Sequence, residues 1–480
     1  MSLTVLSDAN VKQILNNLTK DEVETLQAGL RHSLHEYSTG TNNSGAAAIN
    51  QPKRTVLESS TGTTSLFMPS TSTTGIGMKV VTLAAPPSYT TNECSVPENK
   101  DTTPQGAITL MSADGKPFGF LNAEEVTAFR TALASSLLMI RRRKVKTLTV
   151  FGTGKQAYWH VRLALILRGN TIKKVHLINR DFNERSTSLM KAFVSFDAAT
   201  KRREGWFDTT FDLTSLKYVE VDRLLKDYVR AADIIICTTP STEPLFDHTV
   251  LTNTEGRKRA RLIIAVGSYK PHMIEVPPEV VKQAIKVHGH GHHFHKRAEE
   301  GGVIVVDTLD CVEEAGELKQ AGVGPDRTVE LGEIVLLENL VPLDVHDDDS
   351  PLDSSTDDSS RSSVDLLSTP GDGMSSLAMA FRDSAIEDGS ATPTSKSPSR
   401  KSSFSLSRKA SFSLRSRNSS QGPRERKKKQ TEREDQMCSW LSSGNVIYKS
   451  VGMGLMDLTV GADLVKIARF KKIGTTIDEF

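Results

Sequence analysis

A glycine-rich loop is the clearest chemical signal in the sequence. An apolar run, TLTVFG, leads into the loop, and the helical stretch YWHVRLALILRG follows it. Glycines at such a place let the chain turn tightly and bring backbone N–H groups against a pyrophosphate at the start of a helix. Because the loop follows a strand and opens a helix, it predicts a dinucleotide-binding site. The residues of this loop are Gly152, Thr153, Gly154, Lys155, Gln156 and Ala157.

The end of the next apolar run bears on the kind of dinucleotide. KVHLIN ends at Asn179, and Arg180 and Asp181 follow. An acidic residue at this place would bind the ribose 2′-hydroxyl of NAD, whereas an arginine suits the 2′-phosphate of NADP. Asn179 and Arg180 therefore favour NADPH over NADH, and the neighbouring Asp181 keeps NADH open.

The elements that must position these residues alternate between strand and helix over residues 145–310. Five short apolar runs rich in β-branched residues are typical of strands buried on both faces: TLTVFG, KVHLIN, IIICTTP, LIIAVG and VIVVDT. Their alternation with helical stretches predicts an α/β fold with a doubly wound parallel sheet. Upstream, MKVVTL and AITLMS indicate further strands. A helix is expected to begin after Asn122, whose side chain can cap it.

Composition and charge exclude several classes of protein. The chain has 480 residues, and 60 Lys and Arg balance 58 Asp and Glu. This near neutrality gives no overall field for nucleic acid or a membrane, and no partner of either kind is expected. Four scattered cysteines form neither a disulfide framework nor a zinc motif. With no signal peptide and no apolar run of the roughly 18 residues that span a bilayer, a cytoplasmic protein is expected.

Two segments fall outside this pattern. Residues 343–437 are first acidic and then basic, and rich in serine throughout, so a disordered insert is predicted. Ser403 and Ser411 in its basic half follow RKS and RKA, as in sites of basophilic kinases, so a kinase is an expected partner. The histidine-rich run HGHGHHFH (288–295) could bind a transition metal, but a surface loop is the simpler interpretation. No catalytic metal is expected.

With the dinucleotide loop in place, several further segments make the chain resemble the ornithine cyclodeaminase/mu-crystallin family. They are GMKVVTL (77–83), AFRTALAS (128–135), FGTGKQA (151–157), AVGSYKPHMIEV (265–276), VVDTLDCVEEAGEL (305–318), ELGEI (330–334) and YKSVGMGLMD (448–457). The resemblance implies a Rossmann NAD(P)-binding domain and an α+β substrate and dimerisation domain built from both chain ends, in a homodimer. The expected division is 1–127 and 438–480 for the substrate domain, 128–342 for the Rossmann domain and 343–437 for the insert.

The resemblance also implies which residues bind the substrate, a small amino or imino acid. Arg54, Lys79 and Arg130 match the basic positions of the family's substrate site, and Thr109 matches a position that lines its pocket. Arginine suits a carboxylate because its planar fork binds both oxygens, so Arg54 and Arg130 are expected to anchor the carboxylate. Lys79 is expected to act as an acid or base near the substrate nitrogen.

Other matching segments are expected beside the nicotinamide, and one departs from the family pattern. In the ornithine-deaminating branch, the loop after the fourth Rossmann strand carries an aspartate that acts on the substrate amine, and here that loop has Tyr269. The missing carboxylate disfavours ornithine deamination. The residues expected near the nicotinamide are Thr238, Thr239, Gly267, Ser268, Ser450, Val451 and Gly452.

Three functions follow as alternatives from the resemblance. The first is an NAD(P)H-dependent oxidoreductase that reduces a cyclic imino acid, such as a ketimine or a pyrroline- or piperideine-2-carboxylate, or that interconverts an amino acid and its imine. The second is an ornithine cyclodeaminase, a lyase that forms proline and ammonia with bound NAD. The third is a non-catalytic NADPH-dependent ligand-binding protein of the mu-crystallin type.

Overall fold

The apolar runs between residues 147 and 306 form one parallel sheet, as their composition predicts. In the computed structural model, which describes residues 2–43, 49–60, 63–83, 104–286, 302–335, 337 and 437–480, this sheet has eight strands, all paired in parallel. In spatial order they are β13 (Thr328–Glu330), β12 (Gly302–Val306), β14 (Asn445–Lys449), β11 (Leu262–Ala265), β10 (Ile234–Cys237), β7 (Thr147–Phe151), β8 (Lys174–Asn179) and β9 (Thr210–Ser215). The strand order reverses between β7 and β10, which confirms a doubly wound sheet.

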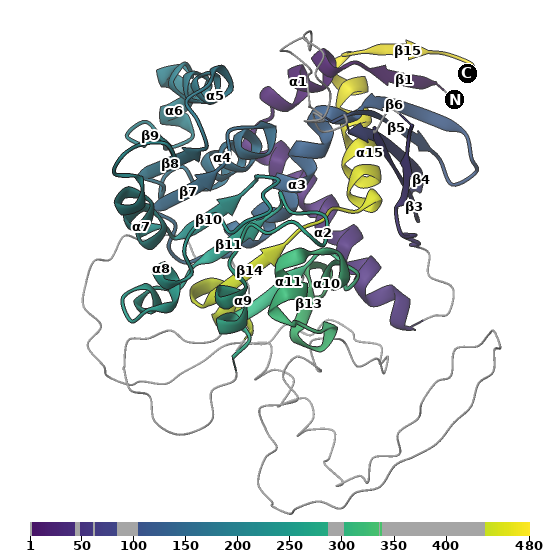
Figure 1. The fold of residues 1–480 in the computed structure, drawn as a ribbon. Coiled ribbons are helices and arrows are strands. Elements are labelled where there is room, and N and C mark those ends of the chain that lie inside the picture. The colour runs from purple at the N-terminus through teal and green to yellow at the C-terminus, as the bar shows by residue number, and fades with distance from the viewer. Residues whose placement is uncertain are drawn as a thin grey trace, which may run out of the picture.

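One strand of this sheet comes from the far end of the chain. Figure 1 shows β14, in yellow, lying among strands coloured teal and green. It pairs with β11 on one side and with β12 on the other. The sequence-based division placed residues 438–480 wholly in the substrate part. The structure instead divides them between the two sheets, because β14 completes the parallel sheet and only the residues after it pack elsewhere.

A second sheet of seven strands is mostly antiparallel. Its order is β15 (Thr475–Ile477), β1 (Leu3–Leu6), β6 (Pro117–Asn122), β5 (Gln105–Met111), β4 (Gly75–Leu83), β3 (Thr64–Ser72) and β2 (Thr55–Glu58). Both chain termini therefore lie at the same edge (Figure 1). The last helix, α15 (Gly454–Lys471), packs against one face of this sheet, where its Leu458 side chain meets the backbone of Gly77.

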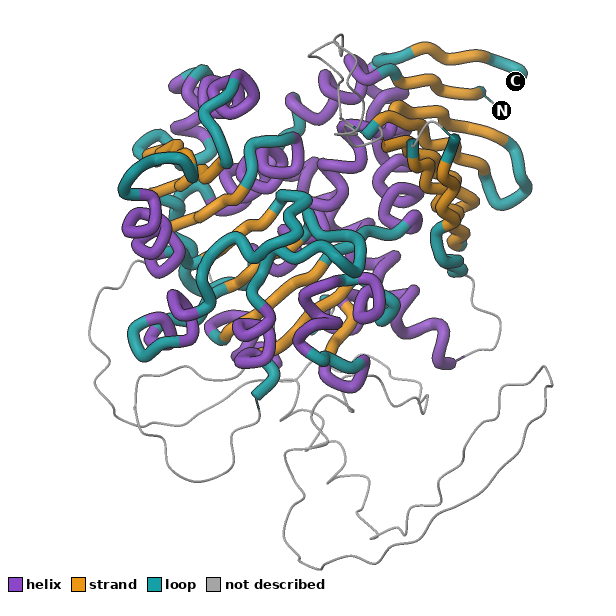
Figure 2. Tube along the Cα trace, viewed as in Figure 1, coloured by secondary structure: helices purple, strands orange, loops and turns teal. Residues whose placement is uncertain are grey.

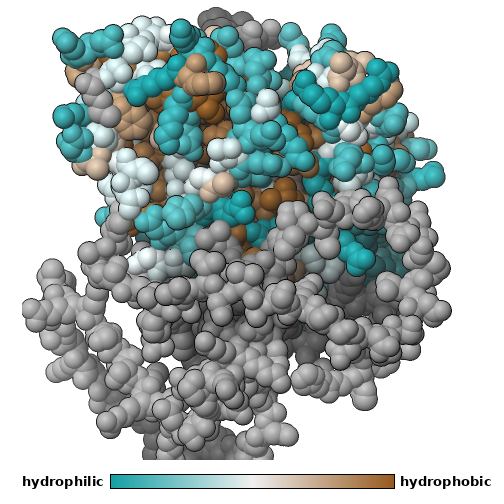
Figure 3. All heavy atoms as spheres, turned by 180° about the vertical axis from the view of Figure 1, so that it is seen from behind, coloured by the Kyte–Doolittle hydropathy of each residue, from teal (hydrophilic) through white to brown (hydrophobic). Residues whose placement is uncertain are grey.

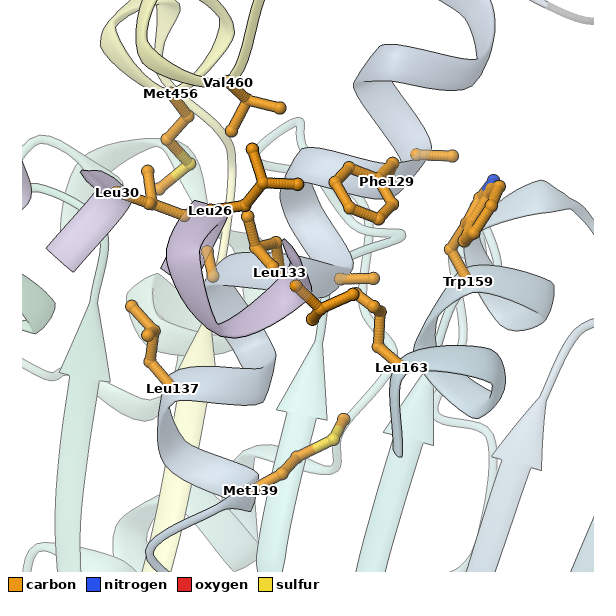
Figure 4. Packing of buried hydrophobic residues seen from close by; sticks show 14 of the residues in the cluster. Leu26, Leu30, Phe129, Leu133, Leu137, Met139, Trp159, Leu163, Met456 and Val460 are labelled. Atoms are coloured by element: carbon orange, nitrogen blue, oxygen red, sulfur yellow. The ribbon is translucent and has the colours of Figure 1, made fainter. Parts of the chain in front are cut away.

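Helix α3 (Ala123–Met139) joins the two sheets. Asn122 caps it by accepting a hydrogen bond from the Glu124 N–H, as predicted, and nearly all of its residues are buried. A helix that is buried all round belongs to the centre of a protein, not to its surface. Figure 4 shows Phe129, Leu133 and Leu137 of α3 among side chains of neighbouring helices, including Trp159 and Met456. The predicted domain boundary at residues 127 and 128 falls inside this helix.

The remaining helices cover the sheets. The loops that follow the strands of the parallel sheet carry the residues expected near the coenzyme. Figure 2 shows loops, in teal, gathered in the middle of the view where strands of the parallel sheet end. The opposite side of the described molecule is mainly hydrophilic, with apolar atoms lying in recesses (Figure 3). These helices are α1 (Asp8–Asn16), α2 (Lys20–Asn43), α4 (Lys155–Arg168), α5 (Glu184–Val194), α6 (Ala198–Arg203), α7 (Val221–Ala231), α8 (Thr249–Thr252), α9 (Pro278–Ala284), α10 (Cys311–Glu314), α11 (Gly316–Ala321) and α12 (Leu331–Ile334).

Candidate active site

Four of the segments expected to contact the coenzyme meet at one edge of the parallel sheet. The segments at 152–157, 238–239, 267–268 and 450–452 follow β7, β10, β11 and β14, and these four strands are neighbours. The carboxyl ends of parallel strands share an edge, and ligands of open α/β sheets bind outside it. The structure thus brings together residues that lie up to 300 positions apart in the sequence.

The glycine loop has the shape that a pyrophosphate requires. Gly152 has φ +103°, and a Cβ there would lie 2.5 Å from Thr238 Oγ1. Gly154 is the N-cap of α4, where no side chain caps the first turn, and a Cβ at this position would meet no atom within 4 Å. The first N–H groups of a helix have no partner within the helix, so those of α4 can donate to phosphate oxygens beside this open position. Ala157 is fully buried against the sheet.

Lys155 of this loop is already paired. Its Nζ lies 2.5 Å from Glu124 Oε1 and 2.7 Å from Glu125 Oε1, at the start of α3. Glu125 in turn accepts a hydrogen bond from Trp159 Nε1 at 2.7 Å. Lys155 thus connects the first turns of α3 and α4, and it is the backbone of the loop that is open to a phosphate.

A buried carboxylate fixes the loops after β10 and β11. Glu275 accepts hydrogen bonds from the backbone N–H groups of Thr239 at 2.7 Å, Gly267 at 2.7 Å and Ser268 at 3.0 Å. Burial raises the pKa of Glu275 to about 7, while the Lys449 ammonium acts in the opposite direction. Sequence reasoning gave Glu275 no role, although it lies inside the segment AVGSYKPHMIEV that carried the resemblance.

A buried ion pair lies beside this carboxylate. The Lys449 ammonium, at the end of β14, lies 3.1 Å from Glu317 Oε1 and donates to Ser268 Oγ at 2.6 Å. The Ser268 hydroxyl also lies 2.7 Å from the same glutamate. Since Lys449 and Glu317 are both fully enclosed, the pair holds the loop after β11 against β14 and α11.

Asp307 positions the segment after β14. It accepts hydrogen bonds from Ser450 Oγ at 2.8 Å and from the N–H groups of Val451 at 3.0 Å and Gly452 at 2.8 Å. Gly452 has φ +82°, and a Cβ there would lie 2.5 Å from Arg130 Nη1. Because Gly452 has no side chain, this segment lies directly against the Arg130 guanidinium. This contact joins the segments expected to bind the coenzyme to the residues expected to bind the substrate.

Lys79 and Arg130 share one buried carboxylate. Lys79 Nζ lies 2.6 Å from Asp457 Oδ2, and Arg130 Nε lies 3.2 Å from Asp457 Oδ1. The three side chains come from β4, α3 and α15, and each is at most 4% exposed. Burial and then the charge of Arg130 lower the pKa of Lys79, Asp457 opposes them, and the result is a pKa of about 8. At this pKa an ammonium can give up a proton near neutral pH.

Arg54 lies at the rim of the same site. Its guanidinium donates a hydrogen bond to Glu314 at the end of α10, and its charge acts on both Lys79 and Tyr269. Burial raises the pKa of the half-buried Tyr269, which keeps its phenol protonated. The charges of both predicted anchors, Arg130 and Arg54, thus act on Lys79, and the charge of Arg54 also acts on Tyr269.

Thr109 is the predicted residue that the structure does not bring to Lys79. It lies on β5 opposite Met78, one position away from the pair formed by Lys79 and Ile108. Side chains alternate between the two faces of a sheet, so Thr109 points to the face opposite Lys79. Thr109 therefore does not share a face of the sheet with Lys79, and its place in the substrate pocket stays a prediction.

At the end of β8, Asn179 Nδ2 donates to the backbone carbonyl of Asp181 at 2.8 Å, and Arg180 is exposed. The Asp181 carboxylate pairs with Lys217 Nζ at 2.6 Å. The sequence-based view had Asp181 available for a ribose hydroxyl and did not consider Lys217.

Sequence reasoning missed six of the buried or paired charges of the site. The signal was present, because all six lie within the segments that carried the family resemblance, but those segments do not show which charges pair. The missed residues are Glu275, Asp307, Glu314, Glu317, Lys449 and Asp457.

Several other predictions fall on residues that the structure does not describe. The histidine-rich run and Ser403 and Ser411 lie outside the described residues, as does nearly all of the predicted insert. Within the described ranges, no helix is long and apolar enough to cross a membrane. In the same ranges no group of His, Cys, Asp and Glu side chains has a geometry that would hold a metal ion.

Comparison with known proteins finds relatives of low sequence identity. No family model matches the chain. An uncharacterized protein of Saccharomyces cerevisiae is 24% identical over 365 residues, covering 71% of this chain and 88% of that protein. A Delta(1)-pyrroline-2-carboxylate reductase of Bacillus cereus is 28% identical over 232 residues, which is 47% of this chain and 59% of the reductase. That match therefore spans less than two thirds of the reductase.

Solved structures share the fold over nearly the whole chain. An archaeal alanine dehydrogenase dimer with bound NAD has a TM-score of 0.56 at 16% identity, with full coverage of both chains. The Thermococcus litoralis Delta(1)-pyrroline-2-carboxylate reductase, in complex with NADH and L-proline, has a TM-score of 0.56 at 15% identity and covers 99% and 100%. A probable ornithine cyclodeaminase from Bordetella pertussis has a TM-score of 0.56 at 16% identity and covers 98% and 99%. These likenesses confirm the fold that the sequence resemblance implied.

Proposed function

We propose that this chain, which resembles the ornithine cyclodeaminase/mu-crystallin family in sequence and in fold, is an NAD(P)H-dependent oxidoreductase that reduces a cyclic imino acid of the ketimine or pyrroline-2-carboxylate type. The observation that carries the proposal is the buried Lys79–Asp457–Arg130 cluster, which lies directly against Gly452 at the coenzyme edge. The reductases among the relatives support the same chemistry.

The residues of the site match the needs of an α-imino acid. A nicotinamide coenzyme held at the glycine loop would supply a hydride for the carbon of the C=N bond. Arg130 and Arg54 bind the substrate carboxylate, since a guanidinium fork can donate to both of its oxygens. The Lys79 ammonium gives its proton to the imine nitrogen and is protonated again from solvent, so imine, hydride and proton together give the amine.

Asp457 and Tyr269 have supporting roles in this scheme. Asp457 forms an ion pair with Lys79 and accepts a hydrogen bond from Arg130, and so it holds the proton donor beside the carboxylate anchor. Tyr269 replaces the carboxylate that ornithine deamination would use, and its protonated phenol cannot serve as that base. We therefore assign the lyase and the non-catalytic binding protein a lower rank than the reductase.

The proposed coenzyme is NADPH. The glycine loop offers backbone donors to a pyrophosphate, and the exposed Arg180 offers a cation to a 2′-phosphate. A homodimer is proposed with the N-terminal strands as its contact, in line with the dimeric alanine dehydrogenase of the same fold. The cytoplasmic location and the phosphorylation of Ser403 and Ser411 stay predictions.

Coenzyme oxidation tests the proposal directly. The purified protein is mixed with NADPH or NADH and with pyrroline-2-carboxylate or piperideine-2-carboxylate, and the absorbance of the reduced coenzyme is followed. Parallel samples with NAD and ornithine are assayed for ammonia and proline. Oxidation driven by an imine supports the reductase. Ammonia and proline without net change of coenzyme would identify the lyase instead, and binding of NADPH without either reaction would favour the binding protein.

A Lys79→Met variant tests the assigned proton donor. General acids contribute roughly 10²–10⁴-fold to rates, so we expect kcat to fall by about that factor while NADPH affinity stays unchanged. Arg130 still pairs with Asp457 in this variant, so the carboxylate is not left alone. Lys116→Met is the matched control, because Lys116 is an exposed lysine near the same sheet. Unchanged kcat in Lys79→Met would remove Lys79 from the mechanism.

A further inference from the structure

We propose that Lys217 is a second cation of the binding site for the 2′-phosphate of NADPH, and that it acts both on the phosphate and on the neighbouring Asp181 carboxylate. The inference rests on the proposed coenzyme and adds a residue to which neither the sequence pattern nor the comparisons assign a role. It comes from the way that β8 and β9 end side by side.

The two loops concerned are fixed to one another by hydrogen bonds. Asn179 and Ser215 are register partners at the ends of β8 and β9. Beyond that pair, the Leu216 N–H donates to the Asn179 carbonyl at 2.9 Å, and the buried Ser215 hydroxyl donates to the Arg180 carbonyl at 3.0 Å. The Lys217 N–H donates to the same hydroxyl at 3.2 Å. These hydrogen bonds hold the backbone of Lys217 beside Arg180 in every conformation of the Lys217 side chain.

The Asp181 carboxylate is neutralised by this arrangement. Its own backbone is held by Asn179, whose side-chain amide donates to the Asp181 carbonyl at 2.8 Å. Lys217 Nζ lies 2.6 Å from Asp181 Oδ1, so the acid that would otherwise accept hydrogen bonds from a ribose 2′-hydroxyl faces a cation. The carboxylate that favours NADH is thus engaged, which removes the objection that Asp181 raised to NADPH.

The local charge then suits a phosphate. Arg180 and Lys217 bring two positive charges against the single negative charge of Asp181. Among the described residues, no ion pair engages the Arg180 guanidinium, and Lys217 is 73% exposed at its side chain. Both cations can turn toward a phosphate outside the sheet edge, and guanidinium and ammonium groups make charge-assisted hydrogen bonds to phosphate oxygens. A 2′-hydroxyl gains nothing from a second cation.

Nucleotide fragments without nicotinamide separate this inference from catalysis. The affinities of 2′,5′-ADP, which carries the 2′-phosphate, and of 5′-AMP, which lacks it, are measured by calorimetry on the full chain. We expect the wild-type protein to bind 2′,5′-ADP more tightly. Lys217→Ala should weaken its binding about tenfold through the loss of one charge-assisted contact and leave 5′-AMP unchanged. Lys226→Ala, which removes an exposed lysine of α7, is the matched control and should change neither affinity.

An Asp181→Asn variant distinguishes whether the Asp181 carboxylate pairs with Lys217 or binds the ribose 2′-hydroxyl. If Lys217 engages Asp181 as proposed, removing the negative charge strengthens 2′,5′-ADP binding and leaves 5′-AMP unchanged. The inference is overturned if Lys217→Ala binds 2′,5′-ADP like the wild type, or if Asp181→Asn weakens 5′-AMP. Because no turnover is needed, a protein that shows the expected affinities yet reduces no imine would keep this inference and lose the proposed reductase.

Discussion

Replacing Asp457 by asparagine should show how far one carboxylate supports the candidate site. In the wild type it neutralises two buried cations, with Lys79 Nζ at 2.6 Å and Arg130 Nε at 3.2 Å. Removing one partner of a buried ion pair costs about 3–5 kcal/mol, because it leaves an uncompensated charge out of water. Small domains are stable by roughly 5–15 kcal/mol, so a loss of this size should be plain in urea unfolding.

The same substitution should move the pH dependence of catalysis. Burial and the two arginines lower the pKa of Lys79 to about 8, and Asp457 is the neighbour that opposes them. Without the carboxylate the pKa falls further, so the protonated acid is lost at a lower pH. The alkaline limb of the pH–rate profile should therefore shift to lower pH in Asp457→Asn, and kcat at neutral pH should fall.

Two comparisons make this prediction refutable. Asp463→Asn on the same helix removes only the partner of an exposed lysine at 2.8 Å and should change stability little. The double variant Lys79→Met/Asp457→Asn removes one of the orphaned charges and should be more stable than Asp457→Asn alone. A single variant as stable as the wild type, with an unshifted alkaline limb, would show that Asp457 does not compensate these cations.

Two further predictions concern the coenzyme edge. Glu275→Gln cannot accept all three backbone N–H groups, and should lose about 1–3 kcal/mol of stability together with coenzyme affinity, measured by unfolding and by NADPH titration. Burial raises the pKa of Glu275 from an ordinary 4.5 to about 7, so the native state binds more protons across that range. Wild-type stability should therefore contain a component that falls as the pH rises from 4.5 to 7, and this component should vanish in the variant.

Gly152→Ala should lower the free energy of unfolding by roughly 1–3 kcal/mol, because φ is +103° and the added Cβ would meet Thr238. Gly154→Ala should instead keep stability and weaken NADPH binding, since its Cβ would enter open space; equal stability of the two alanine variants would contradict this reasoning.

The parallel sheet could be predicted well because its signals are local. Short runs of β-branched residues predict its principal strands, and the glycine loop fixes where the first helix begins. In this sheet β9 was missed because its sequence, TFDLTS, alternates polar and apolar side chains on the half-exposed edge. In the second sheet β1 was missed because four residues carry too little pattern.

The pairing within the site could not be predicted for a different reason. The pattern around Lys79 identifies a strand and its basic residue, but the partner Asp457 lies 378 positions away in the sequence. The same holds for Arg54 and Glu314. Long-range ion pairs leave no periodic trace in either partner, so a single sequence does not reveal which charges pair. The cations Arg54, Lys79 and Arg130 were named because they match basic positions of the family, whereas their carboxylate partners were not. The face on which Thr109 lies could not be predicted either, because it depends on register, and a shift of one residue reverses the face.

The place of β14 also has a consequence for biosynthesis. A ribosome delivers β11 and β12 before residues 307–444, and only then the strand that must lie between them. The nascent sheet therefore has a vacant slot with two unpaired edges during this interval, and such edges invite pairing with other chains. Only the arrival of β14 closes the slot, and it brings Lys449 and the segment at 450–452 with it. The sheet is therefore completed and the site assembled at the same late stage, after the ribosome has synthesised residues 445–452.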